Sequence, residues 1–184
     1  ALQDQPLYPA TEKGIQAWVG VGGSPESVIR AAKYRFPLML AIIGGAPSRF
    51  RPYVELYKRA NEQMGLPQLP IGVHSPGFIA ETDQEAYDLS VNNWLQLQNT
   101  LGQERGWAPA SARQFDHEVS HGSMYVGSPE TVAQRIADTI TTLDLDRFTL
   151  KYVSGPTPHE HLMRCIELYG TQVIPRVREI LAER

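Results

Sequence analysis

The sequence predicts an α/β protein with a parallel sheet, and two observations support this. Four short apolar runs alternate with segments of helical periodicity, and "FPLMLAI" is apolar at nearly every position, which is typical of a parallel strand covered on both faces. This alternation favours right-handed crossovers between parallel strands. The predicted strands lie at 15–23, 36–42, 69–77 and 147–155.

Capping residues mark several of the predicted helices. Ser24 and Ser128 each stand before a Pro-Glu pair, the sequence of an N-cap, a first-turn proline and a first-turn acid. Thr82 and Glu85 form a potential capping box. We expect helices within 24–34, 43–65 and 80–106, from 111, from 129, and over 157–183 with a bend or restart near Pro175. Residues 124–126 are expected to be too short for a barrel strand.

Four strands with their helices correspond to half of a (β/α)8 barrel. A complete barrel needs about 250 residues, and this chain has 184. The alternative is an open, doubly wound parallel sheet with helices on both faces. We expect one domain over 1–184, in which 1–15 is a linker or a loop inherited from an N-terminal half.

Composition and charge exclude several classes of protein. The net charge is −3 and no basic cluster stands out, so we expect neither nucleic-acid nor membrane-surface binding. No apolar run approaches the roughly 18 residues that span a bilayer, and no signal-peptide pattern is present, which predicts a cytoplasmic protein. The single cysteine, Cys165, excludes an internal disulfide and is expected in the core.

Histidine spacing gives no prediction of a metal site. His117 and His121 are four residues apart but lack a third strong ligand, and His161 with Cys165 supplies only two ligands on one helix face. We therefore expect no bound metal.

The turn after the first predicted strand is a candidate phosphate site. Gly22 and Gly23 allow close approach of the backbone to a ligand, and Ser24 and Ser27 bring hydroxyls to a helix N-terminus. The alternative is an ordinary N-cap after a strand. The similar "GSPETV" at 127–132 has one glycine fewer and is fully explained by helix initiation.

Polar residues on two further strands are candidates for the ligand mouth of the sheet. His74 and Ser75 are expected to end the third strand. They would either lie at the ligand mouth of the sheet or form an ordinary polar cap of the strand. Alternation along the fourth strand places Lys151 opposite to its apolar face, where a barrel interior would have to supply a partner.

In order and spacing, several segments resemble the C-terminal half of the bacterial luciferase-like, flavin-dependent monooxygenases. The resemblance covers about 16–180, and the segments are "WVGVGGSPESVIRAAKYRFPLMLAIIGG", "YVELYKRANEQMG", "FIAETDQEAYD", "VGSPETVAQRI" and "RFTLKYVSG". It implies that this chain supplies roughly strands five to eight of a (β/α)8 barrel that binds FMN or a deazaflavin.

The resemblance also implies site residues. Gly23, Ser24 and Ser27 would contact the flavin phosphate, and Ala41, Ile42 and Ile43 would line the flavin pocket. The catalytic residues remain unknown, because the histidine associated with catalysis lies on an early strand of the family's barrel.

The function implied is oxidation of a small organic substrate with reduced flavin and oxygen, with a flavin reductase or NAD(P)H acting indirectly. The isolated chain would be incompetent without the N-terminal half of the barrel or a homo-oligomer mate. The alternative is a non-catalytic homologue that binds a phosphorylated ligand or acts as an assembly partner.

Overall fold

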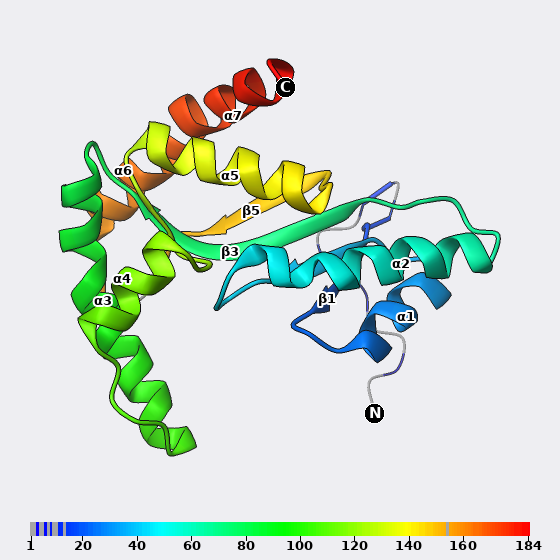
Figure 1. The fold of residues 1–184 in the computed structure, drawn as a ribbon, viewed down its shortest axis with the longest axis horizontal. Helices are drawn as coiled ribbons and strands as arrows, with labels where there is room; N and C mark the ends of the chain where they lie inside the picture. Colours follow the sequence, from blue (N-terminus) through cyan, green and yellow to red (C-terminus); the bar gives the residue numbers. More distant parts are fainter. Residues whose placement is uncertain (1–2, 4–5, 7, 9–10, 13, 154) are drawn as a thin grey trace.

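A computed structural model describes residues 3, 6, 8, 11–12, 14–153 and 155–184. Its five strands form one parallel sheet (Figure 1). The strands are β1 (Val19–Val21), β2 (Leu38–Ala41), β3 (Ile71–Ile79), β4 (Tyr125–Gly127) and β5 (Arg147–Lys151). β2 lies between β1 and β3, and β5 pairs with β3. Most of the predicted linker 1–15 and residue 154 of the last predicted strand lie outside the described residues.

Helices connect the strands in the predicted order. They are α1 (Pro25–Lys33), α2 (Arg51–Gln63), α3 (Asp83–Arg105), α4 (Ala112–Ser120), α5 (Pro129–Leu143), α6 (His159–Leu168) and α7 (Ile174–Ala182). A 3-10 turn, η1 (Pro47–Phe50), precedes α2, and a π-helical turn, η2 (Tyr169–Val173), joins α6 to α7. The restart predicted near Pro175 therefore takes the form of a π-helical turn just before it.

Local capping chemistry explains where most helices begin. The side chains of Ser24, Thr82 and Ser128 each accept from a backbone N–H of the first turn. Ser111 and Gln114 form a reciprocal capping box at the start of α4. The serine and threonine caps lie within three residues of their donors. The capping box predicted at Thr82 is incomplete, because Glu85 Oε2 accepts from the N–H of Glu81 (3.2 Å), and the box at Ser111 was not predicted.

Two strand predictions are wrong. β3 continues past His74 and Ser75 to Ile79, and residues 125–127 form a strand that pairs with its far end. The carbonyl of His74 accepts from the N–H of Ile42 (3.0 Å), so the backbone N–H and C=O groups of the even-numbered residues of β3 point toward β2. Pro76 lies on that edge beyond the end of β2, and its missing N–H removes no ladder bond. The freed edge then pairs with β4.

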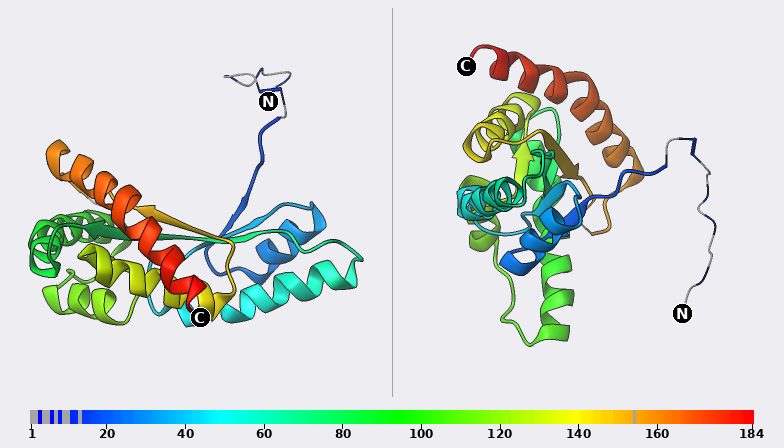
Figure 2. Two further views of the ribbon diagram at one scale, coloured as in Figure 1. Left: turned by 90° about the horizontal axis from the view of Figure 1, so that it is seen from above. Right: turned by 90° about the vertical axis from the view of Figure 1, so that its right-hand side faces the viewer.

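The crossover helices cover only one face of the sheet, as in a barrel and unlike a doubly wound sheet. In Figure 2 (left), α1, α2 and α5 all lie on the same side of the strands. The buried strand residues Val21, Leu40, Val73 and Leu150 belong to that side. The opposite face, called here the open face, carries half-buried or exposed side chains at Met39, Ala41, His74, Arg147, Thr149 and Lys151. The sheet therefore has the helix coverage of half a barrel.

The helix-covered face holds the core. One cluster packs α1 and α2 on β1, β2 and the start of β3, and a second packs α3 to α7 on the end of β3 with β4 and β5. Cys165 is fully buried in the second cluster, and burial raises the pKa of its thiol. No helix in the described part of the chain is long and apolar enough to cross a membrane.

Candidate functional site

The candidate site lies at the carboxyl ends of the parallel strands, where turns follow β1 and β2. The helices α3 and α4 lie next to the turn after β2. Gly22, Gly23 and Ser24 follow β1, and Ile42 and Ile43 follow β2. Ala41 is in register with His74. The residues that the family resemblance implied therefore lie at the same end of the sheet as the residues predicted for the ligand mouth.

The α1 N-terminus has an open approach. A Cβ on Gly22 would meet nothing within 4 Å, and Gly23 has φ +129°, a conformation that favours glycine. The hydroxyl of Tyr53 holds the turn by donating to the carbonyl of Gly23 (2.9 Å). Ser24 Oγ accepts from the N–H of Ser27 (3.2 Å) and donates to Glu26 (2.8 Å). Hydrogen bonds from its own backbone N–H and from Ser24 lower the pKa of Glu26.

The α5 N-terminus, spelled almost identically, already holds an anion. Asp83 Oδ1 accepts from the N–H of Ser128 (2.6 Å), and Oδ2 accepts from the Thr131 hydroxyl (3.0 Å). Gly127 permits this approach, since a Cβ there would lie 2.8 Å from Asp83 Oδ1. A carboxylate at a helix N-terminus satisfies the free N–H groups and the dipole. This end of α5 is therefore closed to a second anion.

The contact of Asp83 predicts a pH-dependent contribution to stability. The hydrogen bond from the backbone of Ser128, and those from the Thr131 and Ser128 side chains, lower the pKa of Asp83 below its ordinary value of 3.8. A depressed folded pKa stabilises the protein above the unfolded pKa, and that stabilisation is lost as the pH falls through the folded pKa. Urea unfolding from pH 7 to pH 3 should show a steeper loss below about pH 4 for wild type than for Asp83→Asn. Asp88→Asn, on the exposed part of the same helix, is the control, and parallel slopes for Asp83→Asn and wild type would contradict this role.

The sheet residues predicted for the site fall on two faces. Ala41, His74 and Lys151 lie on the open face, with Lys151 exposed at the end of β5. Ile42 and Ser75 are fully buried on the helix-covered face, where Ser75 Oγ donates to the carbonyl of Ile42 (2.9 Å). Their side chains contribute to packing and do not line the mouth.

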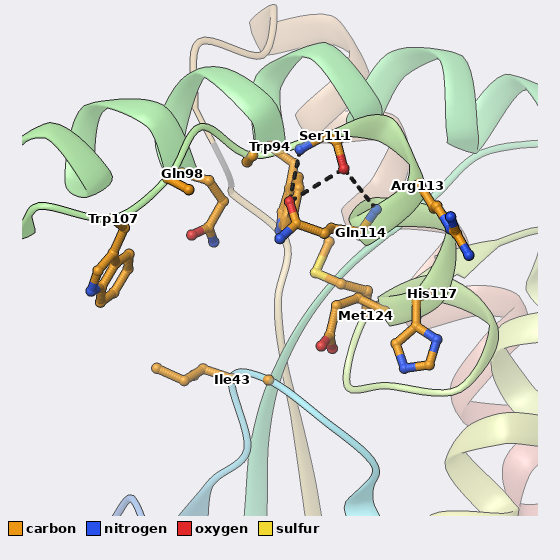
Figure 3. A pocket seen from close by; sticks show the side chains of 13 residues that line it. Ile43, Trp94, Gln98, Trp107, Ser111, Arg113, Gln114, His117 and Met124 are labelled. Atoms are coloured by element: carbon orange, nitrogen blue, oxygen red, sulfur yellow. Dashed lines mark hydrogen bonds between the residues drawn. The ribbon is translucent and has the colours of Figure 1, made fainter.

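A pocket of about 660 Å³ opens beside the end of β2. Figure 3 shows Ile43 at its lower edge, with side chains from α3 and α4 above and beside it. Trp94 is 8% exposed and packs against Phe115, whereas Trp107 and Ile43 are 53% and 72% exposed. Exposed large apolar side chains that gather at one hollow are a feature of ligand sites.

Glu118 joins the two sides of this pocket. Both carboxylate oxygens accept from the N–H of Gly45 at 3.1 Å, and one also accepts from the N–H of Ser123 at 3.1 Å. Gly122 allows the close contact, because a Cβ there would lie 2.0 Å from a Glu118 oxygen. The carboxylate thus fixes the loop after β2 to the end of α4.

Neither this pocket nor the role of Glu118 was predicted from the sequence. The segment 107–124 is the least regular part of the sequence, and Gly45 is 73 positions from Glu118. Only the turn "IGG" after an apolar strand signals that a ligand edge begins there.

His117 lies on α4, and His121 follows the end of that helix. The rings of His117 and His121 stack with centroids 5.2 Å apart. The described residues contain no group of three or more histidine, cysteine or acidic side chains placed to hold a metal ion.

Comparison with known proteins agrees with this architecture. The family described as luciferase-like monooxygenase matches residues 1–146. The chain belongs to this family, which confirms the resemblance found in the sequence. A search of curated proteins found no match.

Solved structures give the same fold. The oxygenating constituent of 3,6-diketocamphane monooxygenase from the CAM plasmid of Pseudomonas putida, in complex with FMN, has a TM-score of 0.65 at 18% identity, covering 87% of this chain and 48% of that one. Monooxygenase RslO1 from Streptomyces bottropensis has a TM-score of 0.68 at 23% identity, covering 90% and 49%. Coenzyme F420 dependent tetrahydromethanopterin reductase from Methanopyrus kandleri has 0.59 at 15%, covering 87% and 50%. The chain thus spans about half the length of these structures, as predicted for a partial barrel.

Proposed function

We propose that this chain carries the flavin-binding half of a luciferase-like oxidoreductase that acts on a small organic molecule. The observation that supports this most is the contrast between two similar helix starts. The N–H groups at the α1 N-terminus meet acceptors of their own turn, Ser24 and Glu26, whereas Asp83 from α3 fills the α5 N-terminus. A flavin phosphate needs free N–H groups at a helix N-terminus. FMN is the preferred cofactor and a deazaflavin the alternative, by analogy with the FMN complex and the F420-dependent reductase among the similar structures.

The residues at the mouth fit the phosphate and the ring of such a cofactor, and one carboxylate opposes its binding. The backbone of Gly22 and Gly23 and the hydroxyl of Ser27 would hold the phosphate, and Ala41 and Ile43 would lie along the ring. Bound reduced flavin supplies the electrons for reaction with oxygen, and the protein positions the ring and excludes water. Glu26 adds a negative charge beside the phosphate position, so its carboxylate opposes binding.

A completed site needs a second body over the open face. Within the described residues β1 pairs only with β2, and β5 pairs only with β3. Unpaired strand edges and an uncovered sheet face are unfavourable in water. They therefore support the presence of a partner that closes the barrel. We propose the N-terminal half of the barrel as that partner, with a second copy of the chain as the alternative. His74 and Lys151 would face the interior formed in this way.

Catalytic groups are expected on the completing half, and a flavin reductase is expected to supply reduced cofactor. The expected compartment is the cytoplasm. The second candidate function, a non-catalytic homologue that binds a phosphorylated ligand, has the same support from the α1 N-terminus. A substrate-dependent change in the oxidation state of the cofactor in the completed protein separates the two, since only the oxidoreductase exchanges electrons between its flavin or deazaflavin and a substrate.

Flavin titration of matched variants tests the phosphate site. Ser27→Ala should weaken FMN binding, and Glu26→Gln should strengthen it by removing a repulsive charge. Ser128→Ala should leave FMN affinity unchanged and lower the free energy of unfolding by about 1 kcal/mol through the lost cap. Flavin fluorescence quenching gives the affinities. Equal losses of affinity for Ser27→Ala and Ser128→Ala would refute the assignment, and no binding of FMN or deazaflavin by the protein completed with the N-terminal half would exclude the oxidoreductase.

A further inference from the structure

Two indoles line the pocket beside β2. Trp94 is held by Phe115, with ring centroids 5.4 Å apart. Gly106 ends α3 in a left-handed conformation (φ +68°), and Trp107 follows it. The backbone N–H of Trp107 donates to the carbonyl of Gly102 (2.9 Å). The Arg105 guanidinium lies 5.0 Å from its ring centroid. Aromatic rings that line one pocket favour a flat ligand, because such a ligand can stack on them.

One wall of the pocket presents an oriented hydrogen-bond donor. The N–H of Ser111 donates to Gln114 Oε1 (2.8 Å), so the capping box fixes which end of the amide is oxygen. Figure 3 shows the amide nitrogen of Gln114 on the opposite side, pointing toward the space between Trp107 and Met124. Within residues 14–153 and 155–184, the hydrogen bonds of Gln114 involve its Oε1 and its backbone N–H and none involves this NH2 group. It is available to a carbonyl oxygen of a ligand.

The pocket does not offer a free carboxylate to a cation. Glu118, the acid among its lining residues, is engaged by the N–H groups of Gly45 and Ser123. Its charge and that of Arg113 formally cancel. The lining therefore suits an uncharged molecule better than an ion.

From these features we propose that the pocket binds a neutral, planar aromatic carbonyl compound, held between the indoles with its oxygen accepting from Gln114 Nε2. As an assignment of the substrate class it rests on the proposed function, whereas the binding itself does not require flavin. The flavin ring is also planar and carries carbonyls, so the test must separate the two ligands.

The three tryptophans of the chain provide the test. In the 15N-labelled protein, each indole N–H gives one NMR signal, which Trp→Phe variants assign. Titration with 2-acetylnaphthalene should move the signals of Trp94 and Trp107. Trp18, which lies with Arg147 on the open face, should not respond and serves as the internal control. No change at Trp94 and Trp107, or an equal change at Trp18, would overturn the proposal.

Gln114→Glu tests the hydrogen bond without removing the cap, because glutamate also serves in a capping box. This variant should bind 2-acetylnaphthalene about fivefold more weakly, but should bind 2-ethylnaphthalene, which has no acceptor, nearly as well as wild type does. Equal losses for both probes would remove Gln114 from the recognition. Loss of the dispersed wild-type indole spectrum would identify an unfolded variant, in which case Gln114→Met replaces it.

Addition of FMN separates substrate from cofactor. Binding of 2-acetylnaphthalene in the presence of saturating FMN supports a distinct substrate pocket. Competition between them would overturn the substrate assignment. Failure of FMN to bind to the protein completed with the N-terminal half, while 2-acetylnaphthalene still moves the signals of Trp94 and Trp107, would refute the proposed function and leave the aromatic pocket standing.

Discussion

Replacing Glu118 with alanine should lower the free energy of unfolding by about 2 kcal/mol, because hydrogen bonds to a charged acceptor are worth about 1.5–3 kcal/mol. The substitution leaves the N–H groups of Gly45 and Ser123 without their acceptor. It also releases the loop that carries Ile43, so ligand affinity at the pocket should fall with stability. Urea unfolding and the indole titration measure the two effects.

Two further variants make this result specific. Glu118→Gln keeps one acceptor oxygen and should lose less stability than the alanine variant. Asp116→Ala lies on the same helix and removes an exposed acceptor from the Tyr87 hydroxyl (2.7 Å), so it should cost less than about 1 kcal/mol. If Glu118→Ala costs no more than Asp116→Ala, then the carboxylate does not hold the loop.

Gly77→Ala should destabilise the protein by about 3 kcal/mol, at the upper end for overpacking a core. A Cβ at Gly77 would lie 2.3 Å from the backbone oxygen of Tyr125 and 2.7 Å from Leu150 Cδ1. The backbone contact cannot be relieved by a rotamer change. β3 and β4 must therefore separate where they pair.

Gly20→Ala is the matched control, since Gly20 lies in the same sheet but on the open face. A Cβ there would meet nothing within 4 Å, and the free energy of unfolding should change by less than about 0.5 kcal/mol. Thermal or urea unfolding compares the two variants. Similar stabilities for both would show that β4 does not pack on β3 as described.

The sequence predicted the features that local chemistry specifies. Serine caps, first-turn prolines and apolar runs placed the helices and four strands, since each signal spans only a few residues. The resemblance then identified the family and the partial barrel. The candidate contacts of Gly22, Gly23, Ser24 and Ser27 with a flavin remain predictions.

Contacts between distant residues were beyond the reach of that analysis. β3 extends past Pro76 because β2 ends early, which no residue near Pro76 encodes. The two similar helix starts differ because Asp83, 45 positions from Ser128, occupies one of them. Sequence alternation also could not show that the helices cover one face of the sheet, which decides between half a barrel and a doubly wound sheet.

Binding of flavin at the α1 N-terminus is the central claim, and the similar helix start of α5 is its internal control. The most direct test is a titration of the 15N-labelled protein with FMN, in which NMR records the positions of the backbone amide signals. The signals of Gly22, Gly23 and Ser27 should move, and those of Ser128 and Thr131 should stay in place. Movement at Ser128 and Thr131, or no movement at either helix start, would contradict the account.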